Sequence, residues 1–319
     1  ALGRLPLQGL RERFRGRRGP LAFLAVVGPV LIAGVAGNDA GGITTYATLG
    51  SSTALRFLWI LPLTALLLAF VQEAVARLGV VTGQGLSDLI RERFGVRWAL
   101  FAMLILVLAN LANTVANVAG AASALAIFDV PVIATAPTVA LLVWILVVYG
   151  TYRSVERVFL ALTAVFLAYI AAALLAQPNW TAVATSITSP NLGGISAAEL
   201  LLVVAVVGTT VTPYMQFYLQ SAVVEKAVGI EELGAARADA VLGSVWTNFI
   251  AACIVIATAV ALGGRGQPIG SAAEAAVALE PLAGTFSKLL FGAGLFGASL
   301  LAMAIMPLTT AFALAEAFG

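Results

Sequence analysis

The stretch that decides the fold reads Gly28-Pro-Val-Leu-Ile-Ala-Gly-Val-Ala-Gly-Asn-Asp-Ala-Gly-Gly-Ile-Thr-Thr45. It lies inside an apolar run and carries one acid, Asp39, among four glycines (Gly34, Gly37, Gly41 and Gly42). Each Gly weakens a helix by about 1 kcal/mol, and an ionised Asp at the centre of a bilayer costs about 2.5–3.5 kcal/mol. These penalties at one place predict that the helix unwinds around Asp39, where the carboxylate and freed carbonyls line a polar cavity. The alternative is an Asp paired with a neighbouring helix, with glycines for close packing.

The composition requires lipid as the solvent for most of the chain. Of 319 residues, 61% are hydrophobic and 10% are charged, against about 25% charged in soluble domains. A bilayer core needs about 20 helical residues, and eight stretches are long enough: 20–49, 57–78, 98–127, 132–149, 157–176, 197–228, 236–262 and 285–315. The connections, such as Gln177–Ser196, are short and polar or rich in Gly and Pro. We therefore predict an all-α integral membrane protein, with residues 1–319 as one transmembrane domain and no cleavable signal peptide.

The distribution of Lys and Arg predicts the topology. Fourteen of the 17 fall on one side: Arg4, Arg11, Arg13, Arg15, Arg17, Arg18, Arg77, Arg91, Arg93, Arg97, Arg153, Arg157, Lys226 and Arg237. Positive loops stay in the cytoplasm, so we expect a multi-pass protein of the plasma (inner) membrane with a cytoplasmic basic N-terminus at 1–19. Orientation alone accounts for the N-terminal Arg cluster; binding of anionic lipids is the alternative.

The sixth span is also interrupted. It reads Val204-Ala-Val-Val-Gly-Thr-Thr-Val-Thr-Pro-Tyr-Met-Gln-Phe-Tyr-Leu-Gln-Ser221, with Pro213 in its middle among Thr, Tyr and Gln side chains. The alternative interpretation is a simple helix kink caused by Pro213, without a functional role. Matched interruptions in two halves of a chain, however, indicate a transporter site at the interface of inverted repeats.

The other predicted spans contain fewer polar residues than the first and the sixth. Asn110, Asn113, Thr114 and Asn117 share one face of the third span, as hydrogen-bonding partners between helices or as a cavity wall. Glu73 ends the second span, reaching toward the cytoplasm or into an inner vestibule. The chain has no His and one Cys, which excludes His-based and thiolate metal sites and argues against an enzyme.

Three segments resemble the NRAMP (natural resistance-associated macrophage protein) family of divalent-metal transporters. Asn38-Asp-Ala-Gly-Gly42 resembles the first-helix motif Asp-Pro-Gly-Asn, Gly208–Tyr214 resembles the sixth-helix segment, and Arg77–Gly95 is the most specific piece. The resemblance implies the leucine-transporter fold of two inverted five-helix repeats. That fold needs ten helices, so we expect C-terminal helices to be absent from this sequence.

The departures from the motifs resemble those of the NRAMP-related magnesium transporters. The motif Pro is Ala40 and the motif Asn is Gly42; the Met is Thr212, the following His is Tyr214, and the Ala that lends a carbonyl is Thr209. The acids of the third helix in proton-coupled members match Thr114 and Asn117.

We predict a site for a transported divalent cation, most favourably hydrated Mg²⁺, with Mn²⁺ as a further cargo. A donor set of oxygens without sulfur suits hard ions, and Mg²⁺ keeps several waters with one or two carboxylates. The predicted residues are Asp39, the Ala36 carbonyl, Gly42, Thr209, Thr212 and Tyr214, with Gln216, Asn113 and Asn117 of second rank. Transport is expected to proceed by alternating access without protons. We expect membrane lipids as surroundings, and no resident cofactor, nucleic acid or obligate protein partner.

Several other functions stay open. A proton-coupled Mn²⁺/Fe²⁺ transporter and an amino-acid carrier share the predicted fold, although Asp39 disfavours an anionic substrate. The sequence lacks the catalytic groups that an intramembrane enzyme would need. A channel would require rings of identical residues contributed by a symmetric oligomer.

Overall fold

The computed structural model describes residues 38–149, 166–263 and 272–318, and in these ranges the chain is helical without a β-strand. The predicted all-α class is confirmed. The helices are α3 (Ala40–Thr53), α4 (Ile60–Thr82), α5 (Leu86–Phe94), α6 (Val96–Ala126), α7 (Val132–Tyr149), α9 (Leu167–Leu175), α10 (Trp180–Thr188), α11 (Ala197–Thr210), α12 (Pro213–Glu225), the short 3₁₀ turn η1 (Ile230–Glu232), α13 (Leu233–Leu262) and α14 (Ala272–Phe318).

Within the described ranges, five helical segments are long and apolar enough to cross a bilayer: Ile60–Thr82, Val96–Ala126, Ala197–Glu225, Ile230–Leu262 and Leu289–Phe318. Val132–Ile145 is a shorter apolar helix. These segments match six of the predicted spans. Most of the first span, and the front of the fifth, lie outside the described residues.

One predicted connection contains a helix, and one predicted boundary was wrong. The connection at 177–196 contains α10, which begins because the Asn179 side chain accepts hydrogen bonds from the amides of Thr181 and Ala182. The last helix starts at Ala272 rather than at 285. The added segment is rich in Ala, Leu and Glu, which favour helix, but its acids and Pro281 lower its hydropathy.

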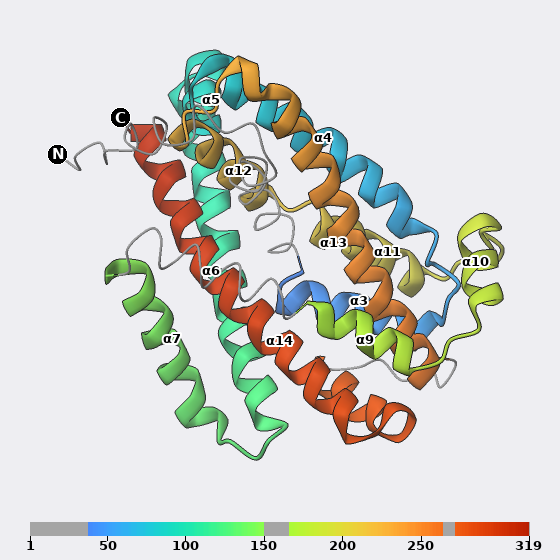
Figure 1. The fold of residues 1–319 in the computed structure, drawn as a ribbon. Coiled ribbons are helices and arrows are strands. Elements are labelled where there is room, and N and C mark those ends of the chain that lie inside the picture. The colour runs from blue at the N-terminus through green and yellow to red at the C-terminus, as the bar shows by residue number, and fades with distance from the viewer. Residues whose placement is uncertain (1–37, 150–165, 264–271, 319) are drawn as a thin grey trace.

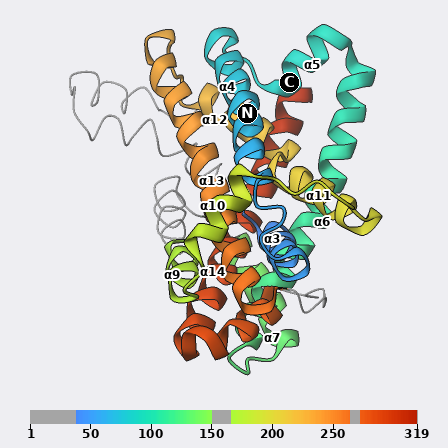
Figure 2. The same ribbon diagram turned by 90° about the vertical axis from the view of Figure 1, so that its right-hand side faces the viewer.

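Close packing around the start of α3 brings three helices together. α13 packs against α3 and α4, while α14 runs along α6 (Figures 1 and 2). Gly120 of α6 faces the Cβ of Ala40 and the hydroxyl of Ser299, so a Cβ at this position would clash. Glycine at 120 therefore lets α6 approach α3 and α14.

The outer face of α6 is suited to lipid. Leu104, Leu108, Leu111 and Val115 follow one another at helical spacing and are 58–62% exposed. A stripe of large exposed apolar side chains is unfavourable in water but is the normal surface of a helix in a bilayer. The chain is therefore an integral membrane protein.

Basic side chains gather at the end of the bundle that carries α5. Glu73 bonds to Arg237 at 2.7 Å and lies 3.6 Å from Arg77, while Arg91 pairs with Asp88 at 3.1 Å. Arg56 lies at the opposite end, in the connection that follows α3. This separation agrees with the predicted topology; the cytoplasmic N-terminus itself stays a prediction.

Candidate metal site at two helix interruptions

Asp39 begins α3 rather than sitting inside a continuous helix. Asn38 and Asp39 are non-helical, and Asp39 has φ −69° and ψ 178°. Its Oδ1 accepts a hydrogen bond of 2.7 Å from the amide of Gly42. The carboxylate thereby caps α3, where the helix dipole favours negative charge. The helix predicted before Asp39 lies outside the described residues, so the break itself stays a prediction. Asp39 is only 6% exposed.

The sixth predicted span is broken at Val211 and Thr212. α11 ends at Thr210 and α12 begins at Pro213, with Thr212 extended at φ −83° and ψ 141°. Proline has no amide hydrogen, so the Thr209 carbonyl, four residues earlier, cannot form a helical bond to residue 213. The break leaves the last α11 carbonyls at the negative end of a helix dipole, which is a favourable position for a cation.

α6 supports Asp39 through one side chain. Asn117 accepts a hydrogen bond from the Ala40 amide at 2.9 Å, and its Nδ2 donates to the Asn113 carbonyl at 2.8 Å and more weakly to Asp39 Oδ2 at 3.4 Å. Asn110 instead donates to Thr310 of α14 at 2.9 Å. The polar face of α6 thus divides: Asn110 joins two helices, whereas Asn117 holds the α3 break.

α3 and α11 are joined next to the two breaks. The Tyr46 hydroxyl lies 2.9 Å from Thr210 Oγ1, and neither residue is exposed. Asp39 is near enough to interact electrostatically with Tyr46 and with Tyr214 of α12. α11 is therefore joined to α3 through Tyr46, and Tyr214 of α12 lies within electrostatic range of the Asp39 carboxylate.

The predicted site residues divide into three groups. Asp39, Tyr214 and Asn117 lie together, and the Gly42 amide caps Asp39. Thr209 and Thr212 are half-buried at the α11–α12 break, Gln216 follows in α12, and the half-buried Asn113 contributes its carbonyl to Asn117. Ala36 lies outside the described residues, so its carbonyl stays a prediction.

Buried oxygen atoms near both breaks lack hydrogen-bond donors. Within the described ranges, Asn38 Oδ1 and Gln216 Oε1 have no partner, and Thr212 Oγ1, with the Tyr214 side chain close by, makes no bond of normal geometry. An unsatisfied buried acceptor costs about 1–3 kcal/mol. Electron-rich atoms left in this way beside a buried carboxylate fit a cation or the waters that it carries.

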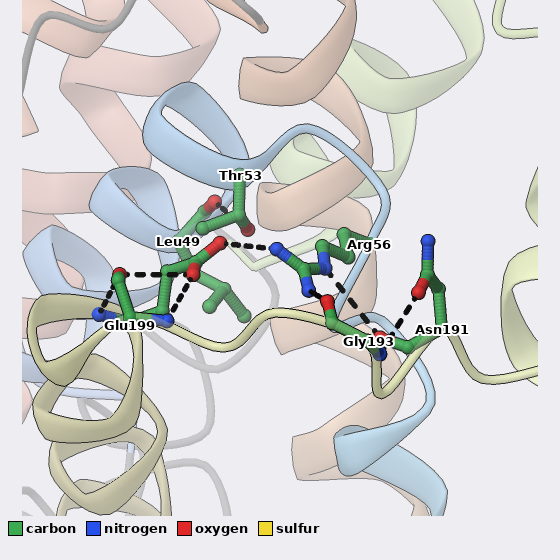
Figure 3. A network of polar contacts seen from close by, with 7 residues as sticks. Leu49, Thr53, Arg56, Asn191, Gly193 and Glu199 are labelled. Carbon is green, nitrogen blue, oxygen red and sulfur yellow. Dashed lines mark hydrogen bonds and ion pairs between the residues drawn. The ribbon is translucent and has the colours of Figure 1, made fainter.

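A second polar network fixes α11 at its other end. Arg56 donates to Glu199 Oε1 at 2.7 Å, to the Asn191 carbonyl at 3.4 Å and to the Gly193 carbonyl (Figure 3). Glu199 also completes the capping box of α11 by accepting from the Ser196 amide at 2.8 Å. α3 and α11 are thus linked both near the breaks and at their far ends.

Sequence reasoning missed Asn38 and Tyr46 as site neighbours and Asp239 as a buried acid. Asn38 stands beside Asp39 in the quoted motif, and Tyr46 lies seven residues after it on the same helix face. Asp239 of α13 is 1% exposed. The sequence pattern did not single out this residue, and only the packing shows that it is buried.

A buried carboxylate at the start of α3, together with the break between α11 and α12, is the arrangement of multi-span membrane proteins built on broken helices, as in secondary transporters. The Nramp family model (natural resistance-associated macrophage protein-like) matches residues 30–319, and the chain belongs to this family.

Relatives and solved structures agree with that assignment. The chain is 28% identical to the divalent metal cation transporter MntH of Caldanaerobacter subterraneus over 294 residues, covering 89% of this chain and 69% of that one. It is 30% identical to MntH of Ralstonia nicotianae over 296 residues, covering 86% and 65%. A crystal structure of a mutant manganese transporter of Eremococcus coleocola shares the fold, with a TM-score of 0.76, 22% identity and coverage of 94% and 67%. This chain therefore spans about two thirds of the length of these relatives.

The expected magnesium branch of the family is not supported. The relatives are named as divalent metal cation or manganese transporters. The substitutions at Gly42, Thr212 and Tyr214 remain facts of this chain, but they do not assign it to a branch.

Proposed function

We propose that this chain carries divalent metal ions across a membrane by alternating access, with Mn²⁺ as the first candidate cargo. The observation that carries the proposal is the buried Asp39 carboxylate at the start of α3. Among the described residues, the adjoining Asn38 has a buried oxygen atom without a hydrogen-bond partner, and Gln216 of α12 has another. The names of the relatives favour Mn²⁺. Carboxylate, carbonyl and hydroxyl oxygens suit Mn²⁺ as well as Mg²⁺.

The arrangement favours a cation over an anionic solute. In a carrier for amino acids, a half-helix N-terminus would be free to bind the substrate carboxylate. Here the α3 N-terminus is already occupied by Asp39, through the Gly42 amide. A second carboxylate at this place would be repelled, whereas a cation would be attracted by Asp39 and by the carbonyl end of α11.

The break supplies a physical reason for ion release. A cation between α3 and α11 is held by groups on separate half-helices, so a change in their separation changes the number of ligands. Because Pro213 leaves the Thr209 carbonyl without a helical amide partner, this carbonyl can bind and release an ion without breaking helix structure. We assign Asp39 the charge attraction, and Thr209, Thr212 and Tyr214 the neutral oxygens.

Mg²⁺ is a second candidate cargo because of the donor set. Thr212 provides a hydroxyl and Gly42 provides no side chain, so neither supplies a soft ligand or fills the space that a hydrated ion needs. We further propose that transport is not proton-coupled, because the α6 side chain beside Asp39 is the neutral amide of Asn117.

Ion uptake into proteoliposomes tests the function. At a fixed membrane potential, proteoliposomes with the wild-type protein should take up Mn²⁺. Excess Mg²⁺ in the outer solution should reduce the rate of Mn²⁺ uptake if both ions share the site. Alanine and leucine should have no effect. Empty liposomes provide the baseline. Uptake of an amino acid with no Mn²⁺ or Mg²⁺ entry would overturn the proposal.

A further inference from the structure

Asn38 differs from other buried asparagines in how its amide is used. The side chain is 0% exposed. Its Nδ2 donates a hydrogen bond of 3.1 Å to the Thr247 carbonyl of α13, and its buried Oδ1 has no partner among the residues that the structure describes. By contrast, Asn248 accepts from Thr64 at 2.7 Å and donates to the Ser244 carbonyl at 3.0 Å. Both the oxygen and the nitrogen of the Asn248 amide are hydrogen-bonded within the protein, whereas only the nitrogen of the Asn38 amide is bonded.

The bond to Thr247 fixes which end of the amide remains free. If the amide turned over, its oxygen would face the carbonyl oxygen of Thr247, and two acceptors would be brought together. The nitrogen must therefore stay toward α13, which leaves the oxygen available. Gln216 is arranged in the same way, because its Nε2 faces the Thr212 carbonyl at 3.5 Å and its Oε1 is unpartnered.

We propose that Asn38 Oδ1 is an oxygen ligand of the transported divalent ion, or of a water in its first shell. This inference rests on the proposed function. Asn38 adjoins Asp39 in the non-helical segment, and Gly42 of the next turn has no side chain to offer. Asn38 thereby supplies an amide oxygen from the amino-terminal side of Asp39. The cost of leaving that oxygen unpaired in the empty site is recovered when the ion or its water binds.

A pair of variants separates this role from a structural one. Asn38→Leu has the matched control Asn248→Leu, which removes a buried amide used at both ends. Thermal unfolding without metal and Mn²⁺ titration calorimetry are measured on both purified proteins. We expect Asn38→Leu to weaken Mn²⁺ binding by about 10- to 100-fold, as the loss of a ligand-shell partner does, while its unfolding temperature without metal stays equal or rises. Asn248→Leu should lower the unfolding temperature.

A rescue variant adds a second test. Asn38→Leu combined with Gly42→Asn returns an amide oxygen from the other side of Asp39, and it should recover at least part of the lost Mn²⁺ affinity. If Asn38→Leu does not fold, Asn38→Ala takes its place in both measurements.

The outcomes are decisive. Mn²⁺ affinity within about twofold of wild type in a folded Asn38 variant overturns the inference, as does failure of both Asn38 variants to fold, which would make the amide structural. If the wild-type protein binds neither Mn²⁺ nor Mg²⁺, the proposed function itself fails. Wild-type binding that is lost in Asp39→Ala but kept in Asn38→Leu would reject only the role of Asn38.

Discussion

The hydrogen bond between Tyr46 and Thr210 makes an asymmetric prediction for two single substitutions. Thr210 Oγ1 donates its hydrogen to the Val206 carbonyl at 2.7 Å. The Tyr46 hydroxyl, 2.9 Å from the same oxygen, must therefore be the donor to Thr210. Both side chains are fully buried, so water cannot replace a missing partner.

The magnitudes follow from what each change leaves behind. Tyr46→Phe removes the donor but leaves Thr210 bonded to Val206, so it should cost about 0.5–1.5 kcal/mol of unfolding free energy. Thr210→Val leaves the Tyr46 hydroxyl buried without a partner and should cost more, about 1–3 kcal/mol. In the double variant no polar atom is orphaned, so its cost should be close to that of Tyr46→Phe alone. The coupling between the two sites should therefore equal the cost of Thr210→Val alone, about 1–3 kcal/mol.

Reversible unfolding of the three variants in detergent micelles, followed by tryptophan fluorescence, measures these differences. The expected order of stability is Tyr46→Phe above Thr210→Val, with the double variant more stable than Thr210→Val. Additive losses in the double variant, or a Tyr46→Phe variant less stable than Thr210→Val, would refute the assignment of the donor and the link between α3 and α11.

Three further predictions concern the far end of α11, ion selectivity and protons. Arg56→Gln should lower the unfolding temperature more than Glu199→Gln. A glutamine at position 199 can still cap α11, whereas the Arg56 change also removes the bonds to the Asn191 and Gly193 carbonyls. Equal effects of the two changes would show that only the ion pair matters. Gly42→Asn with Thr212→Met should tighten Mn²⁺ or Cd²⁺ binding and slow Mg²⁺ transport, since sulfur favours softer ions; an unchanged preference among these ions in the folded variant would count against the oxygen-site argument. Metal entry into proteoliposomes should leave a lumenal pH dye unchanged at clamped voltage; acidification that scales with metal entry would establish proton coupling.

The helices could be predicted because lipid imposes a strong rule on sequence. The 132–149 stretch matches α7 at both ends, and the interruptions at Asp39 and Pro213 are visible as polar or helix-breaking residues in apolar runs. The start of α14 could not be predicted, since hydropathy measures suitability for lipid rather than helix formation. α10 was missed for the same reason, because its polar surface resembles that of a loop.

Individual site residues were harder to predict than the breaks. Spacing placed Asn110 and Asn117 on one face of α6, but only the packing of α14 and α3 shows that Asn110 bonds Thr310 while Asn117 holds the Asp39 segment. The importance of Asn38 depends on which amide atom has a partner. That property is decided by Thr247 of α13, which lies 209 residues later in the chain.

The most direct test of the central claim is Mn²⁺ binding by Asp39→Asn. Asn is also a good helix cap, so this variant keeps the size and the capping oxygen of Asp39 while removing its charge. The claim predicts an unchanged fold, checked by circular dichroism and unfolding temperature, with Mn²⁺ affinity reduced more than tenfold in calorimetric titration. An Asp39→Asn protein that is folded and binds Mn²⁺ as tightly as the wild type would contradict the assignment of Asp39 as the group that attracts the ion.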